Sequence, residues 1–315
     1  MARPRTVLVV NPAAQGGRLG KRWPELAGEI RRELGGFEEA LTAAPGDAGR
    51  LTREALESGA GTVVAVGGDG TINEVANGFF DGDRARAPEA ALGVVPFGTG
   101  GDFRRSLRVP QATRDAARIL ADGHTRTIDA GHLTYTDLEG QTRTRVFVNI
   151  SSFGWSGLVV EIANTSSKRF GAKASFMLAA ARGLMRYENQ RVRMVFDGDE
   201  KGAVELGVAV VAVANGRFFG GGMQIAPTAE LDDGSFDVVA VADVSKLTLV
   251  RSFPRVYSGS HLDNEGVSLR RAKQVRAEPL GTVPVRLDVD GENPGKLPAT
   301  FRVLPGALRV VCPRA

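Results

Sequence analysis

Short apolar runs alternate with segments of helical periodicity along the first third of the chain. The continuous apolar run Val7–Val10 is typical of a parallel strand that is buried on both faces. Further strands are predicted at Phe37–Thr42, Thr62–Val66 and Leu92–Val95. Apolar residues at helical spacing predict helices at Trp23–Leu34, Ala48–Leu56, Ile72–Phe79 and Ala116–Leu120. The polar, proline-bounded segment Asp81–Glu89 is expected to be a surface loop. Strands that alternate with helices predict a parallel sheet with helices packed on its faces.

The pattern changes after about residue 125, where strand-length stretches separated by turn residues dominate. Strands are predicted at Thr125–Asp129, Arg145–Phe153, Arg191–Phe196, Leu206–Ala214, Phe236–Val241, Val285–Val289 and Ala307–Val311. Helical spacing interrupts them at about Ala172–Tyr187 and Leu247–Tyr257. Many strands at short spacing favour a sandwich or a barrel. We therefore expect an α/β domain over residues 1–125 and a β-rich domain over residues 126–315.

Glycine is the unusual feature of the composition, with 40 of 315 residues, nearly twice the typical share of ~7%. The sequence has no Gly-x-y period, and its hydrophobic content of 43% is too high for a disordered chain. The single cysteine, Cys312, excludes an internal disulfide framework, and three separated histidines do not favour a zinc site. A metal in this protein is therefore expected to be a hard cation bound by carboxylates and carbonyls.

Net charge and the length of apolar runs restrict the partners. The formal net charge is +4 and aromatic residues make up only 6%, unlike the dense basic stripe with stacking aromatics of a nucleic-acid binder. The run Val7–Val10 is too short for the core of a signal peptide, and the run near Val208–Ala214 is too short to span a bilayer. We expect a cytoplasmic protein that binds no nucleic acid, with peripheral membrane contact left open.

Two glycine-rich turns follow two of the predicted strands, at Gly67–Thr71 and Pro96–Asp102. The carboxyl ends of parallel strands lie at one edge of a sheet, where backbone N–H groups and a helix N-terminus can bind phosphate. Asp69 and Asp102 lie inside these turns, and carboxylates suit a phosphate site when a divalent cation bridges them to the phosphate oxygens. The alternative is a pair of tight turns with capping residues, but two such turns at one edge favour a phosphate site. Neither a Walker A motif nor a G-x-G-x-x-G motif after the first strand is present.

The stretch Gly67–Gly78, Gly-Gly-Asp-Gly-Thr-Ile-Asn-Glu-Val-Ala-Asn-Gly, resembles the signature of the diacylglycerol kinase and sphingosine kinase family of lipid kinases. Four further stretches agree with that family in chain order: Asn11-Pro12, Pro96–Phe103, Pro227–Asp237, and Asp288–Glu292 with Gly295–Pro298 after it. The resemblance runs from about residue 5 to residue 312 and is closest to soluble bacterial diacylglycerol kinases. The first motif alone is shared in part with NAD kinases and phosphofructokinases, whereas the five together are specific.

The resemblance implies a nucleotide-binding α/β domain and a lipid-binding β-sandwich domain, with the active site in the cleft between them. By position, ATP would be contacted by residues of the first domain: Asn11, Thr42, Gly67, Gly68, Asp69, Gly70, Thr71, Glu74 and Thr99. Asp69 and Asp102 would organise a catalytic Mg²⁺ through water.

The resemblance also assigns roles to acidic residues of the second domain. Asp290, with Glu292 beside it, would supply the general base. Asp233, with the backbone carbonyls of Glu230 and Ser235, would hold a structural Mg²⁺. Without the resemblance, the residues near Asp290 would be interpreted as an exposed acidic hairpin tip, and those near Asp233 as an ordinary turn.

Two positions leave their roles open. The family's second turn usually reads Gly-Thr-x-Asn-Asp, and Gly101 stands here in place of the asparagine, which removes a side-chain amide from the site. Glu74 lies one helical turn after Gly70, where it can be a capping-box residue, a nucleotide contact, or both.

The basic segment Lys168–Lys173 leads into apolar residues, which suits either an element at a membrane interface or a helix packed on the sandwich. Arg182 follows it, where the family can carry a basic residue for lipid binding. We expect an ATP- and Mg²⁺-dependent kinase that phosphorylates the hydroxyl of diacylglycerol or a related lipid at the inner face of the membrane. The alternatives are a soluble-substrate kinase such as an NAD kinase, and a non-catalytic lipid- or nucleotide-binding regulator. The sequence defines neither the lipid nor whether the protein is a homodimer.

Overall fold

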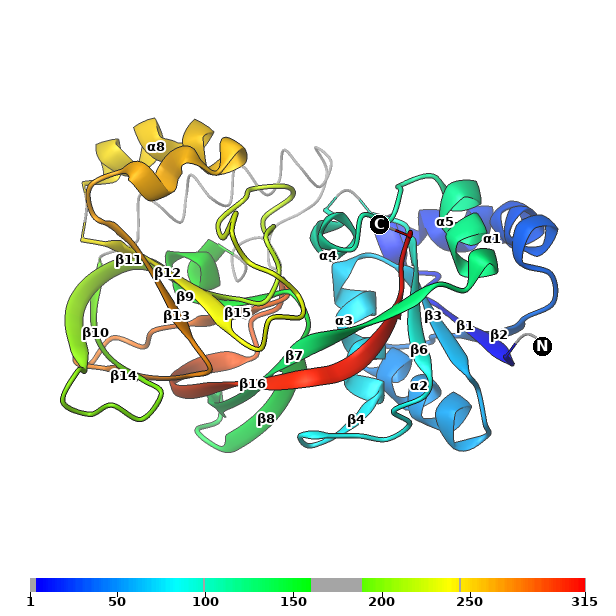
Figure 1. Cartoon of the computed structure of the whole chain (residues 1–315), viewed down its shortest axis with the longest axis horizontal. Coiled ribbons are helices and arrows are strands. Elements are labelled where there is room, and N and C mark those ends of the chain that lie inside the picture. Colours follow the sequence, from blue (N-terminus) through cyan, green and yellow to red (C-terminus); the bar gives the residue numbers. More distant parts are fainter. Residues whose placement is uncertain (1–3, 99, 160–188, 244, 315) are drawn as a thin grey trace.

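The computed structural model describes residues 4–98, 100–159, 189–243 and 245–314 (Figure 1). Thr99, Arg182 and the helix expected at about Ala172–Tyr187 therefore lie outside the described residues. Among the helices within these ranges, none combines the length and the apolar content needed to cross a bilayer.

Four parallel strands form the sheet of the N-terminal half. The elements of this half are β1 (Thr6–Val10), α1 (Ala14–Leu34), β2 (Glu38–Leu41), α2 (Asp47–Glu57), β3 (Thr62–Gly67), α3 (Asp69–Gly78), β4 (Phe80–Asp81), β5 (Arg84–Ala85), β6 (Ala91–Pro96), α4 (Asp102–Ser106) and α5 (Thr113–Asp122). The strands lie in the order β6-β3-β1-β2 with parallel pairing. Helix α1 packs beside α5, and α2 packs beside α3 (Figure 1). This arrangement confirms the α/β organisation predicted from the alternating pattern.

Buried apolar side chains explain why these elements form where the sequence predicts them. Strands β1, β3 and β6 are buried almost throughout, as expected for strands covered by helices on both faces. In α1, the side chains of Trp23, Leu26, Ile30 and Leu34 are buried, and their spacing is the one that predicted this helix. The parallel sheet is therefore a rigid base for the turns that follow its strands.

The C-terminal half is built mainly from antiparallel strands. Its elements are β7 (Thr125–Asp137), β8 (Thr142–Phe147), β9 (Ile150–Gly154), β10 (Gln190–Phe196), β11 (Val204–Ala214), β12 (Phe236–Ala242), α8 (Lys246–Ser258), the short 3-10 helix η1 (Ser260–Asp263), β13 (Val267–Ala272), β14 (Gln274–Pro279), β15 (Leu287–Val289) and β16 (Gly295–Val311). The order is β13-β12-β11-β10-β14-β16, while β9 pairs with β11 and β15, and β7 pairs with β8 and β16. Phe147, Phe153, Phe236 and Phe301 belong to a second hydrophobic core. The predicted β-rich architecture of the C-terminal half is confirmed.

Strand β16 belongs to both halves of the molecule. It pairs in antiparallel fashion with β14 and β7, and at Arg309 and Val310 it pairs in parallel with β6. Figure 1 shows β7 and β16 running from one half to the other. One sheet of 14 strands therefore joins the two halves. The sequence predicts only Ala307–Val311 of this long strand, because Pro305-Gly306 interrupts the apolar pattern before it.

Several local expectations differ from the structure. The stretch Arg145–Phe153, predicted as one strand, is divided between β8 and β9 at Val148-Asn149, whose N–H groups donate to a side chain. The expected loop Asp81–Glu89 contains β5 and the end of β4, which form a small hairpin. Only Leu287–Val289 of the strand expected at Val285–Val289 is in β15. The apolar pattern does not predict β13 and β14, because charged residues interrupt it.

Candidate active site

The first glycine-rich turn joins β3 to α3, because β3 ends at Gly67 and α3 begins at Asp69. A β-carbon on Gly67 would lie 2.5 Å from the hydroxyl oxygen of Thr71, so this close approach requires glycine. Asn11, which follows β1, donates from its side-chain amide to the same hydroxyl at 3.0 Å. The turn therefore places the positive end of the α3 dipole at the carboxyl edge of the sheet.

The second glycine-rich turn lies against the first. Gly67 and Pro96 are partners in the β3–β6 ladder, and the N–H of Phe97 donates to the carbonyl of Gly67 at 2.7 Å. A β-carbon on Gly98 would lie 3.3 Å from the α-carbon of Gly68. The structure thus brings together the two turns that the sequence predicts at one edge of the sheet.

Asp69 links the two turns through its carboxylate. Its Oδ2 accepts a hydrogen bond from the N–H of Gly101 at 2.7 Å, and its Oδ1 accepts one from the N–H of Asp102 at 3.0 Å. A β-carbon on Gly100 would lie 2.7 Å from Asp69 Oδ2. The backbone of the second turn therefore fixes the carboxylate that the sequence places in a phosphate site.

Asp102 is buried at the same place and contacts the C-terminal half. Its Oδ1 accepts a hydrogen bond of 2.9 Å from Nη1 of Arg105, and its Oδ2 accepts one of 2.8 Å from the N–H of Gly221. Burial, and next the negative charge of Asp69, raise the pKa of Asp102 to about 6. Two carboxylates whose charges repel each other fit a divalent cation. Because their oxygens already accept hydrogen bonds from the protein, the pair fits Mg²⁺ held through water.

Arg104 fills the space that a side chain at position 101 would take. Gly101 has a φ of 65°, and a β-carbon there would lie 2.6 Å from Nε of Arg104. The Nε atom is buried and has no hydrogen-bond partner among the described residues. Gly101 and Arg104 therefore fit each other, and the missing side-chain amide is replaced by the stem of an arginine.

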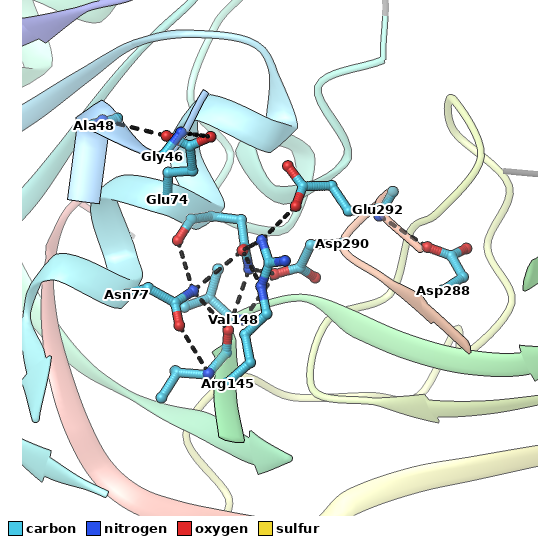
Figure 2. A network of polar contacts seen from close by, with 12 residues as sticks. Gly46, Ala48, Glu74, Asn77, Arg145, Val148, Asp288, Asp290 and Glu292 are labelled. Atoms are coloured by element: carbon cyan, nitrogen blue, oxygen red, sulfur yellow. Dashed lines mark hydrogen bonds and ion pairs between the residues drawn. The ribbon is translucent and has the colours of Figure 1, made fainter. Parts of the chain in front are cut away.

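Glu74 holds the chain that leads into α2. Its Oε1 accepts a hydrogen bond from the N–H of Gly46 at 3.0 Å, and its Oε2 accepts one from the N–H of Ala48 at 3.2 Å (Figure 2). It therefore caps α2 and does not form a capping box on its own helix, which was one of the roles left open for it. Thr42 follows β2 and donates its N–H to the carbonyl of Val10 at 2.9 Å. The roles of Thr42 and Glu74 in nucleotide binding stay predictions.

Asp290 comes from the turn after β15, and its carboxylate reaches helix α3 of the other half. Oδ1 accepts hydrogen bonds from the N–H groups of Asn149 at 3.2 Å and Ile150 at 2.9 Å. Oδ2 accepts one from the N–H of Val148 at 3.0 Å and one from the side-chain amide of Asn73 at 2.7 Å. Burial raises the pKa of Asp290, although these hydrogen bonds favour its charged form.

Arg145 on β8 joins Glu292 to the same helix (Figure 2). Its Nε donates to Oδ1 of Asn73 at 3.0 Å, and its Nη2 donates to Oε2 of Glu292 at 2.6 Å. The other oxygen of that carboxylate, Oε1, lies 3.2 Å from the position that a β-carbon on Gly70 would take. A carboxylate of the C-terminal half is thus held at the first glycine-rich turn.

The sequence does not single out Arg145, Asn73 or Asn77 as site residues. Asn77 donates from Nδ2 to the carbonyl of Val146 at 2.8 Å and accepts from the N–H of Val146 at 2.9 Å. Asn73 and Asn77 are four residues apart on α3 and therefore lie on one face. Two amides at this spacing are the signal that could have indicated a polar contact with another element. Nothing in the sequence around Arg145 distinguishes it.

Asp288, two residues before Asp290, is only 9% exposed. Its Oδ1 accepts a hydrogen bond from the N–H of Gly291 at 2.9 Å, and the hydroxyl of Ser152 donates to Oδ2 at 3.4 Å. Burial raises the pKa of Asp288 to about 7. The alternative of an exposed acidic tip is therefore wrong for Asp288, because its strand lies against β9 with Asp288 opposite Ser152.

The turn predicted to hold a structural Mg²⁺ is fixed by protein contacts. Oδ1 of Asp233 accepts a hydrogen bond from the N–H of Ser235 at 3.0 Å, and Oδ2 forms an ion pair with Arg271. The N–H of Gly234 donates to Oδ2 of the buried Asp129 at 2.6 Å. Within the described ranges, no group of three or more His, Cys, Asp or Glu side chains is placed to bind a metal. A site formed with the backbone carbonyls of Glu230 and Ser235 stays a prediction.

Comparison with known families matches both halves of the chain. Residues 5–133 match the diacylglycerol kinase catalytic domain, and residues 149–312 match the YegS C-terminal NAD kinase beta sandwich-like domain. The second match alone covers more than half of the chain.

Relatives resemble the chain along most of its length. A diacylglycerol kinase of Mycobacterium tuberculosis is 31% identical over 269 residues, which cover 85% of this chain and 82% of that protein. A diacylglycerol kinase of Staphylococcus carnosus is 30% identical over 318 residues, covering 99% of this chain and 96% of that protein. A crystal structure of a diacylglycerol kinase from Bacillus anthracis shares the fold, with a TM-score of 0.70 and 21% identity over 98% of this chain and 97% of that one. The chain therefore belongs to the diacylglycerol kinase family of lipid kinases.

Proposed function

We propose that the protein transfers the γ-phosphoryl group of ATP to the hydroxyl of diacylglycerol or a related lipid. The observation that carries this proposal is the position of Glu292, whose Oε1 lies 3.2 Å from the β-carbon position of Gly70. The carboxylate of Glu292, which can accept a proton, therefore lies beside the turn Gly67–Thr71, which is suited to binding phosphate. The family supports a kinase, and the relatives called diacylglycerol kinases support a lipid acceptor.

Phosphoryl transfer depends on positioning and on neutralising the charge of the phosphates. In the proposed reaction, Gly67–Thr71 binds the phosphates through backbone N–H groups and the dipole of α3. Asn11 holds the hydroxyl of Thr71 and so fixes the shape of this turn. Asp69 and Asp102 would hold Mg²⁺ through water, and the cation would supply further neutralisation when bound.

We assign the role of general base to Glu292 and not to Asp290. Each oxygen of Asp290 accepts two hydrogen bonds, so all the lone-pair positions of that carboxylate are in use. Oε1 of Glu292 accepts no hydrogen bond from the residues that the structure describes. As the lipid hydroxyl attacks the γ-phosphorus, its proton passes to Oε1 of Glu292, and the bond to ADP breaks.

We also propose that the lipid is met at a membrane surface, with Arg182 as a candidate contact. Support comes from the sequence, where the basic segment Lys168–Lys173 stands beside apolar residues. NAD remains a second candidate acceptor, because the family matched by the C-terminal half is described as NAD kinase beta sandwich-like.

The proposal is tested by supplying the purified protein with labelled ATP and Mg²⁺ and one acceptor at a time. The acceptors are diacylglycerol in mixed micelles, sphingosine in the same micelles, and NAD in solution. We expect label in the phosphorylated form of diacylglycerol, and loss of that label when the divalent cation is chelated. Label in NAD alone, or in none of the three acceptors, would overturn the proposal.

A further inference from the structure

The carboxylate of Glu292 needs a second group to set its orientation. Glu292 follows Asp290 and Gly291, which both have positive φ angles, and its side chain is 37% exposed. A partly exposed carboxylate in a turn of the chain adopts several rotamers unless a hydrogen bond fixes it. Among the described residues, the side chain of Arg145 is the hydrogen-bond partner of that carboxylate, with 2.6 Å between Nη2 and Oε2. Arg145 therefore fixes the orientation of the Glu292 carboxylate, in which one oxygen faces the first glycine-rich turn.

Arg145 is itself held from helix α3. Its side chain is only 19% exposed, and its Nε donates to Oδ1 of Asn73 at 3.0 Å, with Nη2 in contact with the same oxygen. Asn73 is in turn fixed by its bond to Asp290 at 2.7 Å and by the amide of Asn77 at 3.1 Å. Since α3 begins at the glycine-rich turn, the chain of contacts ties Glu292 to the element that carries that turn.

We propose that Arg145 is a positioning residue, which holds Oε2 of Glu292 so that Oε1 faces the site of phosphoryl transfer. This inference rests on the proposed function. Arginine suits the task because its planar guanidinium presents several donors in a fixed fork, and here the fork spans Asn73 and Glu292. A lysine at this position keeps the positive charge but cannot hold both partners in the same geometry.

The variant Arg145→Met tests the proposal through its effect on kcat and KM. We expect kcat to fall about 10- to 100-fold, because a small displacement of a catalytic group has an effect of this size. The KM values for ATP and for lipid should change less than kcat, since Arg145 contacts neither of them in this account. Arg145→Lys should give an intermediate kcat. Equal effects on kcat of Arg145→Lys and Arg145→Met, or a change in KM alone, would contradict a positioning role.

Arg143→Met is the matched control on the same strand. Arg143 is the residue two places earlier on β8 and forms its ion pair with Asp137 at 3.0 Å. This exchange removes a cation and an ion pair of β8 but leaves the contacts of Glu292 in place. We expect kcat within about two-fold of the wild type, as for a surface substitution. A loss equal to that of Arg145→Met would mean that any disturbance of β8 slows the reaction, and would overturn the proposal.

A double-mutant cycle separates positioning from a general structural role. In the Glu292→Gln background, Arg145→Met should cause no further loss of kcat, because the group that Arg145 positions is already disabled. If the double variant loses kcat by the product of the two single losses, the proposal is overturned. The same cycle measured on the free energy of unfolding in urea should also be non-additive, whichever acceptor the protein uses. A protein that phosphorylates no lipid but keeps this coupling would overturn the proposed function alone, whereas additive unfolding effects would overturn the role of Arg145.

Discussion

The side-chain amide of Asn73 donates a hydrogen bond of 2.7 Å to Oδ2 of Asp290, which lies 217 residues later in the chain. Asn73 is one turn into the helix that begins at the first glycine-rich turn, and Asp290 belongs to the turn that carries Glu292. The bond therefore joins the two parts of the candidate active site. The carboxylate of Asp290 also explains the break between β8 and β9, because the N–H groups of Val148 and Asn149 donate to it.

Replacing Asp290 with asparagine should destabilise the protein. An asparagine at this position keeps one oxygen, which accepts two hydrogen bonds, so two of the four N–H donors lose their acceptor. We expect the free energy of unfolding to fall by about 2–3 kcal/mol, measured by urea denaturation. Asp122→Asn at an exposed position is the control and should stay within about 0.5 kcal/mol of the wild type. An unchanged stability of Asp290→Asn would contradict the account of this contact.

Asp288 should make the stability depend on pH. Its pKa rises from 3.8 to about 7 on folding, so between these values the folded protein binds a proton that the unfolded chain does not. The free energy of unfolding therefore falls as the pH rises through this window. Urea denaturation at pH 5, 6, 7 and 8 should show a weaker fall for Asp288→Asn than for the wild type. Identical pH profiles for the two proteins would show that Asp288 keeps its ordinary pKa.

The first turn should not tolerate a β-carbon at position 67. In Gly67→Ala the new carbon overlaps the hydroxyl of Thr71, so Thr71 must move and its bond to Asn11 breaks. We expect a loss of about 1–3 kcal/mol in the free energy of unfolding and weaker ATP binding, measured by isothermal titration calorimetry. Gly28→Ala is the control, because it adds a carbon in open space within α1. That exchange should stabilise the protein by about 0.5–1 kcal/mol.

The effect on stability of a substitution at Gly101 should depend on the side chain at position 104. Asparagine accepts the left-handed φ of 65°, but its β-carbon would meet Nε of Arg104 at 2.6 Å. We expect Gly101→Asn to lower the free energy of unfolding by about 1–2 kcal/mol. Adding Arg104→Ala should recover most of this loss, because it removes the overlapping atoms. Additive losses in the double variant, measured in urea, would show that the two side chains do not share one space.

The fold of the N-terminal half could be predicted closely because its signals are local. Val7–Val10 and Val63–Val66 are continuous apolar runs, and the strands β1 and β3 differ from the predicted strands Val7–Val10 and Thr62–Val66 by one residue at one end. Local patterns do not predict the pairing of β16 with β6, because the two strands are more than 200 residues apart in the chain. A hydrophobic pattern contains no information about such a partner, so the sequence does not indicate that one continuous sheet joins the two halves.

The residues of the candidate site also divide into those that a local pattern predicts and those that it does not. Gly67, Asp69 and Asp102 could be predicted because glycine-rich turns place backbone and carboxylate together within a few residues. Arg145 could not be predicted, since its proposed role depends on contacts with Asn73 and Glu292 that only the folded chain creates. The burial of Asp288 was missed for a related reason: alternation along a strand shows which residues share a face, but not what covers that face.

We propose that Glu292 accepts the proton of a lipid hydroxyl during phosphoryl transfer from ATP. The most direct measurement is the initial rate of transfer from labelled ATP to diacylglycerol, compared between the wild type, Glu292→Gln and the exposed control Glu139→Gln at saturating Mg²⁺. We expect Glu292→Gln to lose at least about 100-fold in kcat, while Glu139→Gln should match the wild type. Equal rates for Glu292→Gln and the wild type would contradict it.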